Sequence, residues 1–154
     1  MITSCDKKAS GQLLIPAIIE GKPVTSIGEY AFSRCSGLTS IMIPDSVTSI
    51  GKGAFSECSK LTSITIPDSV TSIRSGAFGS CTSLPSITFR GNAPTLGGGN
   101  VFLRIPANAK VFIYEGASGF GGKFGGFSVV VQKKTVPPKI ISVVSSGDII
   151  PMSS

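Results

Sequence analysis

A 23-residue motif occurs three times in succession in this chain, and no other feature constrains the fold as strongly. Its copies share a valine at the start, a cysteine in the middle and a leucine near the end: Val24, Val47 and Val70; Cys35, Cys58 and Cys81; Leu38, Leu61 and Leu84. Self-similarity at a fixed period of this length indicates a solenoid, because one unit cannot bury its own apolar face and must stack on copies of itself. The sequence therefore predicts a single repeat domain.

Each unit is expected to begin with a short strand. In the copy that starts at Ile41, Ile41 and Ile43 alternate with Met42, which is the two-residue period of a strand buried on one face. The tripeptide Pro44-Asp45-Ser46 follows and predicts a turn, since proline removes a ladder donor and the next two side chains can bond to nearby amides.

The second half of the unit predicts a bent strand and then a helix. Val47 and Ile50 are three residues apart, a spacing that favours a bent extended segment over a flat strand. Ala54, Cys58 and Leu61 then recur at positions i, i+4 and i+7, the apolar stripe of a helix of about two turns. One coil thus consists of strand, turn, bent strand and short helix, and the strands of successive coils are expected to pair in parallel.

Stacking of such coils should place identical residues in ladders through the core. The expected ladders are Ile27, Ile50 and Ile73; Phe32, Phe55 and Phe78; and Leu38, Leu61 and Leu84.

The run IPDSVTSIGKGAFSECSKLTSITIP resembles the BspA-type leucine-rich repeat of bacterial and protist surface proteins, and the resemblance covers about residues 13–89. It implies an α/β, β-rich fold: a right-handed leucine-rich-repeat solenoid of short parallel strands and short helices with a cap at each end. Where the general consensus of leucine-rich repeats has an Asn or Cys after the strand, this chain has Ser69 and an offset Val70. Hydrogen bonding to the backbone carbonyls on the inside of the curve should therefore differ from that in the horseshoe-shaped leucine-rich-repeat proteins.

Four segments follow from the period and from where it breaks. Residues 1–23 are expected to form an N-terminal cap with an extended first unit, 24–86 the three repeats, 87–131 a glycine-rich C-terminal capping unit, and 132–154 a linker or an extra strand. A nucleotide-binding loop is the alternative for the glycine-rich unit, but no lysine-serine pair follows a glycine loop there.

Net charge argues against nucleic acid as a partner. The formal charge is +6, yet residues 24–86 hold four bases and four acids, so the whole excess lies outside the repeats. Single scattered charges solubilise the ends of a domain, whereas a nucleic-acid reader concentrates its bases on one face. No segment approaches the roughly 18 apolar residues of a membrane span, and the first ten residues lack the apolar core of a secretory signal.

Catalysis is not expected, because the chain contains no histidine and so lacks the commonest general base and the usual partner of a nucleophilic serine or cysteine. Asp45 and Asp68 occupy equivalent turns about one coil apart, a separation close to that of a glycosidase carboxyl pair, but the repeat itself accounts for them. The three repeat cysteines are expected to be buried thiols, in preference to disulfides or zinc ligands. We expect no enzyme activity, cofactor or metal.

The candidate contact surface is the outward row of the strand ladder. It comprises Ser40, Met42, Ser63, Thr65, Ser86 and Thr88. Any one of these side chains is equally compatible with a merely solvated face.

The function predicted is that of a non-catalytic module that binds a protein or glycan, within a surface or secreted adhesin-like protein as the resemblance implies. The alternative is a structural subunit that self-associates into a homo-oligomer through the C-terminal tail or a sheet edge. An extracellular or cell-surface location follows from the resemblance alone, and neither nucleic acid nor membrane insertion is expected.

Overall fold

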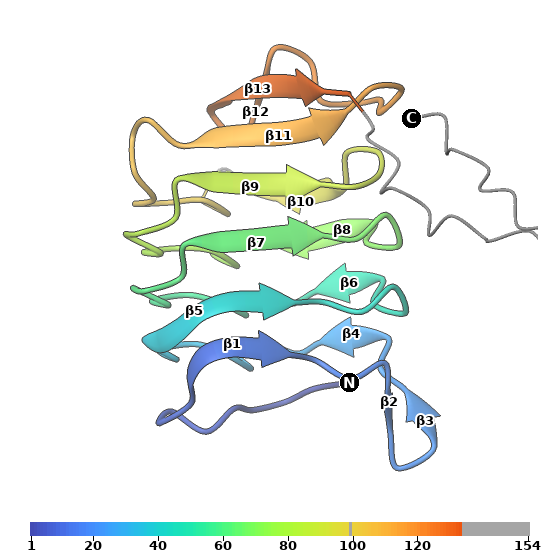
Figure 1. The fold of residues 1–154 in the computed structure, drawn as a ribbon, viewed down its shortest axis with the longest axis vertical. Helices are drawn as coiled ribbons and strands as arrows, with labels where there is room; N and C mark the ends of the chain where they lie inside the picture. The colour runs from blue at the N-terminus through green and yellow to red at the C-terminus, as the bar shows by residue number, and fades with distance from the viewer. Residues whose placement is uncertain (99, 134–154) are drawn as a thin grey trace, which may run out of the picture.

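The structure is a computed structural model that describes residues 1–98 and 100–133. Three sheets occur in these residues, and the strands of the largest succeed one another along the long axis of the molecule (Figure 1). The chain passes repeatedly between this sheet and a second one behind it, and each of the first four coils contributes one strand to each.

The largest sheet has seven strands in the order β1-β5-β7-β9-β11-β13-β12. Their bounds are Ser10–Leu14 (β1), Gly37–Met42 (β5), Ser63–Ile66 (β7), Ser86–Phe89 (β9), Lys110–Tyr114 (β11), Lys123–Phe124 (β12) and Phe127–Gln132 (β13). All neighbours pair in parallel except β12 with β13. Ser40 lies opposite Ser63 and Ile64 opposite Ile87, so the pairing follows the 23-residue period of the sequence.

The second sheet has four short strands in the order β10-β8-β6-β4, and all of its pairs are parallel. Their bounds are Ser26–Ile27 (β4), Ser49–Ile50 (β6), Ser72–Arg74 (β8) and Thr95–Gly97 (β10). β4, β6 and β8 correspond to the bent segments predicted in the three repeats, whereas β10 lies beyond the exact repeat. A two-stranded hairpin of Ile18–Ile19 (β2) and Lys22–Pro23 (β3) lies apart from both sheets, next to the first coil (Figure 1).

The predicted short helices are wrong: none of the described residues is helical. In the second unit, amide-to-carbonyl bonds of Ala54 to Gly51, of Ser56 to Gly53 and of Cys58 to Phe55 close a series of overlapping four-residue turns. Gly53 and Glu57 have φ angles of 59° and 58°. A left-handed residue in each turn prevents the helix from propagating.

Alternate amides of this segment bond to the next coil instead of to their own segment. Phe55 N–H donates to the carbonyl of Ala77 at 2.7 Å and Glu57 N–H to that of Gly79 at 2.8 Å. The same bonds join the first unit to the second, where Phe32 N–H donates to Ala54 at 2.7 Å. Each repeat coil is therefore hydrogen-bonded to its neighbour along three sides, which satisfies buried backbone groups without a helix.

The predicted ladders form the core, as expected. Phe55, Ile50 and Leu61 of the middle unit are fully buried, and so are their equivalents in the third unit. Phe32, Phe55 and Phe78 stack with ring centroids 5.3 and 5.4 Å apart. The stack continues to Phe102 at 5.7 Å, although the 23-residue motif has ended before that residue.

The segment 87–131 extends the solenoid after the exact repeat is lost. β9, β11 and β13 continue the parallel ladder, and Phe89 packs against Phe120 and Phe124 at 5.3 and 5.5 Å. The turn between β12 and β13 contains Gly125 and Gly126 at φ angles of 60° and 92°. The tail assigned above to a linker or strand lies outside the described residues after residue 133.

Residues 1–98 and 100–133 contain no helix that is long and apolar enough to span a membrane.

Candidate functional site on the seven-stranded sheet

The six predicted contact residues lie on one face of the seven-stranded sheet, which we call the ladder face: the outward side chains of β1, β5, β7, β9 and β11. Met42, Thr65 and Thr88 are register partners on successive strands, and Ser40 is paired with Ser63. Met42 is 53% exposed, Thr65 and Ser63 are exposed, and the remaining three are half-buried. The sequence prediction that these residues share a face is consistent with the register, while their role in binding stays a prediction.

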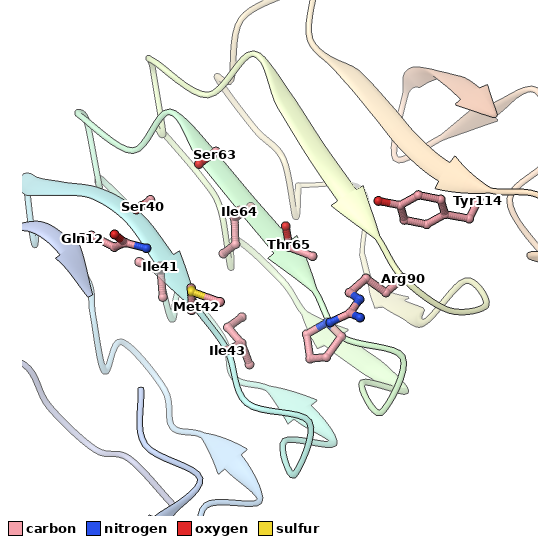
Figure 2. A pocket seen from close by; sticks show the side chains of 11 residues that line it. Gln12, Ser40, Ile41, Met42, Ile43, Ser63, Ile64, Thr65, Arg90 and Tyr114 are labelled. Carbon is pink, nitrogen blue, oxygen red and sulfur yellow. The ribbon is translucent and has the colours of Figure 1, made fainter. Parts of the chain in front are cut away.

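A groove of about 460 Å³ crosses the ladder face from β1 to β11 (Figure 2). Ser40, Met42, Ser63 and Thr65 line it, whereas Ser86 and Thr88 do not. Its walls also include residues that the sequence analysis did not single out: Gln12, Pro67, Arg90 and Tyr114.

The period of two could have identified two of these missed residues. Arg90 follows Ser86 and Thr88 at the same spacing, one residue beyond the end of β9. Tyr114 follows Lys110 and Phe112 in β11 in the same way, and Lys110 and Phe112 are the register partners of Ser86 and Thr88. The relevant signal was alternation in strands that lie outside the exact repeat.

A second hollow of about 350 Å³ adjoins the groove at its β1 end and is largely apolar. Met42, Ile43 and Arg90 line both hollows. The wall of the second hollow is otherwise formed by residues from the first two coils: Leu14, Ile15, Pro16, Ala17, Pro44 and Asp45. Leu14 is 68% exposed, so this end of the ladder face presents large aliphatic side chains to solvent.

Arg90 is the single charged residue that lines the groove. Among the residues that the structure describes, the one ion pair joins Arg34 to Glu57 at 3.4 Å, and Arg90 has no carboxylate within 4 Å. Its backbone is held in place, because Arg90 N–H donates to the carbonyl of Ile66 at 3.0 Å. The groove therefore carries an exposed guanidinium that is free of an acidic partner within the described part of the chain.

The buried cysteines are poorly suited to act as nucleophiles or metal ligands. Cys35 is fully buried, and burial is the main cause that raises the pKa of its thiol to about 12. The pKa of Cys58 is also raised, first by a hydrogen bond with Cys81 and then by burial. Thiols that resist ionisation are poor nucleophiles and poor metal ligands. No group of three His, Cys, Asp or Glu side chains suited to a metal occurs in the described residues.

The aspartates of the Pro-Asp-Ser turns do not share a hollow. Asp45 lines the apolar hollow, and Asp68 lines a separate one together with Thr71 and Asn92. Both carboxylates are exposed. This placement gives no support to a paired acid and base.

A family model described as a BspA-type leucine-rich repeat region of six copies matches residues 11–113. The chain belongs to the BspA-type leucine-rich repeat family. This match starts in β1 and ends in β11, so it includes every strand that lines the groove. Leucine-rich repeat domains are typically non-catalytic and generally act as protein-interaction modules, and BspA-type repeats are common in surface or secreted bacterial proteins.

Among solved structures, this BspA-type chain is similar to the crystal structure of a T. pallidum leucine-rich repeat protein. The two are 27% identical with a TM-score of 0.57. The match covers 70% of this chain and 59% of the other, so the chain spans less than two thirds of that protein's length. A search of curated proteins finds no match to the chain.

Proposed function

We propose that this BspA-type repeat domain is a non-catalytic binding module that contacts a protein or glycan through its ladder face. The observation that carries the proposal is the groove, which is lined by small polar side chains, by residues of four strands of the ladder face, and by one unpaired cation just beyond β9. Solenoids commonly bind partners across such extended faces, because stacking supplies the rigidity and outward side chains are free to vary.

A surface or secreted setting is part of this proposal. The family supports it, and a domain that is hydrogen-bonded between coils on three sides suits a rigid display role. Within such a setting the domain would act as the adhesive part of a larger protein.

The test is a triple variant, Met42→Lys/Thr65→Lys/Thr88→Lys, screened with the parent chain against immobilised matrix proteins and glycans. Three ammonium groups across successive strands should abolish capture of any ligand that the parent binds. The matched control is Thr48→Lys/Thr71→Lys/Thr95→Lys, which adds the same charge to exposed threonines beside the four-stranded sheet. Retained capture by the ladder-face variant would contradict the proposal, provided that circular dichroism shows both variants folded.

Self-association is the second candidate function, and the sheet edges favour it. β1 is an outermost strand of the seven-stranded sheet, and β12 pairs with only the first residues of β13, Phe127 and Ser128. Exposed strand edges can accept a strand from another chain. Light scattering coupled to size exclusion, on chains ending at Gln132 and at Ser154, would contradict this alternative if both were monomers.

A further inference from the structure

The groove has the dimensions of an extended peptide. It runs from Gln12 on β1 to Tyr114 on β11, which is four strand spacings, or about 19 Å at roughly 4.8 Å each. A fully extended chain rises about 3.3 Å per residue, so some six residues would span the groove. Small side chains such as Ser63 and Thr65 occupy its middle and leave room for a second backbone to approach the sheet.

One end of the groove favours an aliphatic side chain. Met42 and Leu14 are 53% and 68% exposed, and they border the hollow formed by Pro16, Ala17 and Pro44. Covering exposed apolar surface is favourable, and a flexible Met side chain adapts to the shape of what covers it. A glycan offers no aliphatic side chain to this hollow, so the apolar end favours a polypeptide.

The charge of Arg90 is the second feature that limits which ligand fits the groove. Its guanidinium borders the groove and the apolar hollow, and within the described chain no carboxylate lies within 4 Å of it. Arg90 also lines the hollows that contain Asp45 and Asp68, but it forms an ion pair with neither, and neither aspartate lines the groove. A guanidinium presents a planar fork of donors that matches a carboxylate with two parallel hydrogen bonds.

We propose that the ladder face recognises an extended, acidic peptide segment in which a Leu, Ile or Met side chain fills the hollow beside Met42 and an Asp or Glu carboxylate pairs with Arg90. Arg90 lies one residue beyond β9, two strand spacings from the strand of Met42, so the two are at least roughly 10 Å apart. Side chains on one side of an extended peptide recur every second residue, so the aliphatic and acidic residues stand at i and i+2 or at i and i+4. This inference rests on the binding role proposed for the ladder face.

Selection from a phage-displayed library of random dodecapeptides, on the full chain, tests the peptide class. The enriched peptides are expected to share an acid two or four residues from a large aliphatic residue. Enrichment of peptides without an acid, or no enrichment, would overturn the inference. Glycan binding in the matrix screen, lost in the ladder-face triple variant, would overturn it too while leaving the proposed function standing.

Charge exchange then tests the role of Arg90 with synthetic copies of the enriched peptides. Arg90→Glu should weaken binding at least tenfold, and replacing the peptide's acid by Lys should restore part of the affinity to that variant. The control is Arg74→Glu, which makes the same change on β8 of the other sheet and should leave the affinity within twofold. Unchanged affinity in Arg90→Glu would overturn the inference.

A triple variant that adds carboxylates, Met42→Glu/Thr65→Glu/Thr88→Glu, separates the binding role of the ladder face from the acidic anchor, because added lysines would attract an acidic peptide. If it still binds the peptides with full affinity, the ladder face is not the site and the proposed function fails with the inference. If it loses them while Arg90→Glu keeps full affinity, the ladder face stands and only the acidic anchor is wrong.

Discussion

The thiol of Cys58 donates a hydrogen bond to the main-chain carbonyl of Phe32 in the preceding coil, over 3.2 Å. Cys81 makes the same bond to the carbonyl of Phe55 at 3.1 Å. The sequence lacks the Asn or Cys that the general consensus places directly after the strand. In this chain the buried cysteines of the turn segment donate to backbone carbonyls of the preceding coil instead. The ladder of side-chain donors is therefore present, but at a different position along the unit.

Removing this thiol should destabilise the domain. In Cys58→Ala a fully buried side chain loses its donor and leaves a small void, which together cost about 1–3 kcal/mol. Cys58→Ser keeps a donor and should be at least as stable as Cys58→Ala. Urea unfolding measures both, and a Ser variant clearly less stable than the Ala variant would show that the thiol acts by packing alone.

Alkaline pH should weaken the fold through Cys35. Its pKa is raised from 9.0 to about 12, chiefly by burial, so between these values the unfolded state releases a proton that the native state retains. The unfolded state then binds fewer protons, and the free energy of unfolding falls as the pH rises from about 9 to 12. Urea unfolding of the parent and of Cys35→Ser at pH 8 and pH 10.5 should show a steeper loss in the parent. An equal loss of unfolding free energy in the two chains would contradict the raised pKa of Cys35.

The phenylalanine stack should be the most sensitive part of the core. Phe55 is fully buried and lies between Phe32 and Phe78, with centroids 5.3 and 5.4 Å away. Phe55→Ala should cost about 3–5 kcal/mol, since stacked coils on both sides limit collapse of the void. The control is Tyr30→Ala, an aromatic truncation at a side chain that is 50% exposed, which should cost far less in the same thermal unfolding experiment.

Two equivalent glycines should differ in their tolerance of a methyl group. Gly53 and Gly76 have φ angles of 59° and 66°, so alanine at either position incurs about 1–2 kcal/mol of left-handed strain. At Gly53 the added Cβ also collides with the ring of Tyr30, whereas at Gly76 it meets open space.

Gly53→Ala should therefore destabilise the domain more than Gly76→Ala in urea unfolding. The double variant Gly53→Ala/Tyr30→Ala, compared with Tyr30→Ala, should show only the smaller cost of Gly76→Ala. An excess cost that persists without the Tyr30 ring would locate the conflict elsewhere.

The predicted helix failed for a reason that the apolar pattern cannot reveal. Ala54, Cys58 and Leu61 do point inward at helical spacing, and all three are fully buried. Successive tight turns can bury the same positions, and what distinguishes them from a helix is the partner of each amide. Phe55 N–H bonds to Ala77 in the next coil, 22 residues away, and that contact exists only after the coils have stacked.

The candidate site was predicted in part for a similar reason. Alternation within a strand placed Met42, Thr65 and Thr88 on one face, since register follows the 23-residue period. The groove also needs Gln12 from the first coil and Tyr114 from a strand outside the exact repeat. Side chains from coils of different sequence become neighbours only through the stack.

The sequence by itself determined the solenoid, the inward ladders and the outward rows, because a repeated motif can bury its apolar residues only by placing equivalent positions in register. The tertiary structure decided the turns in place of helices, the thiol-to-carbonyl bonds and the placement of Arg90 and Met42 along one groove. Each of these depends on which groups of different coils the stack brings near one another. That proximity is a property of the stack, and the pattern within one unit does not contain it.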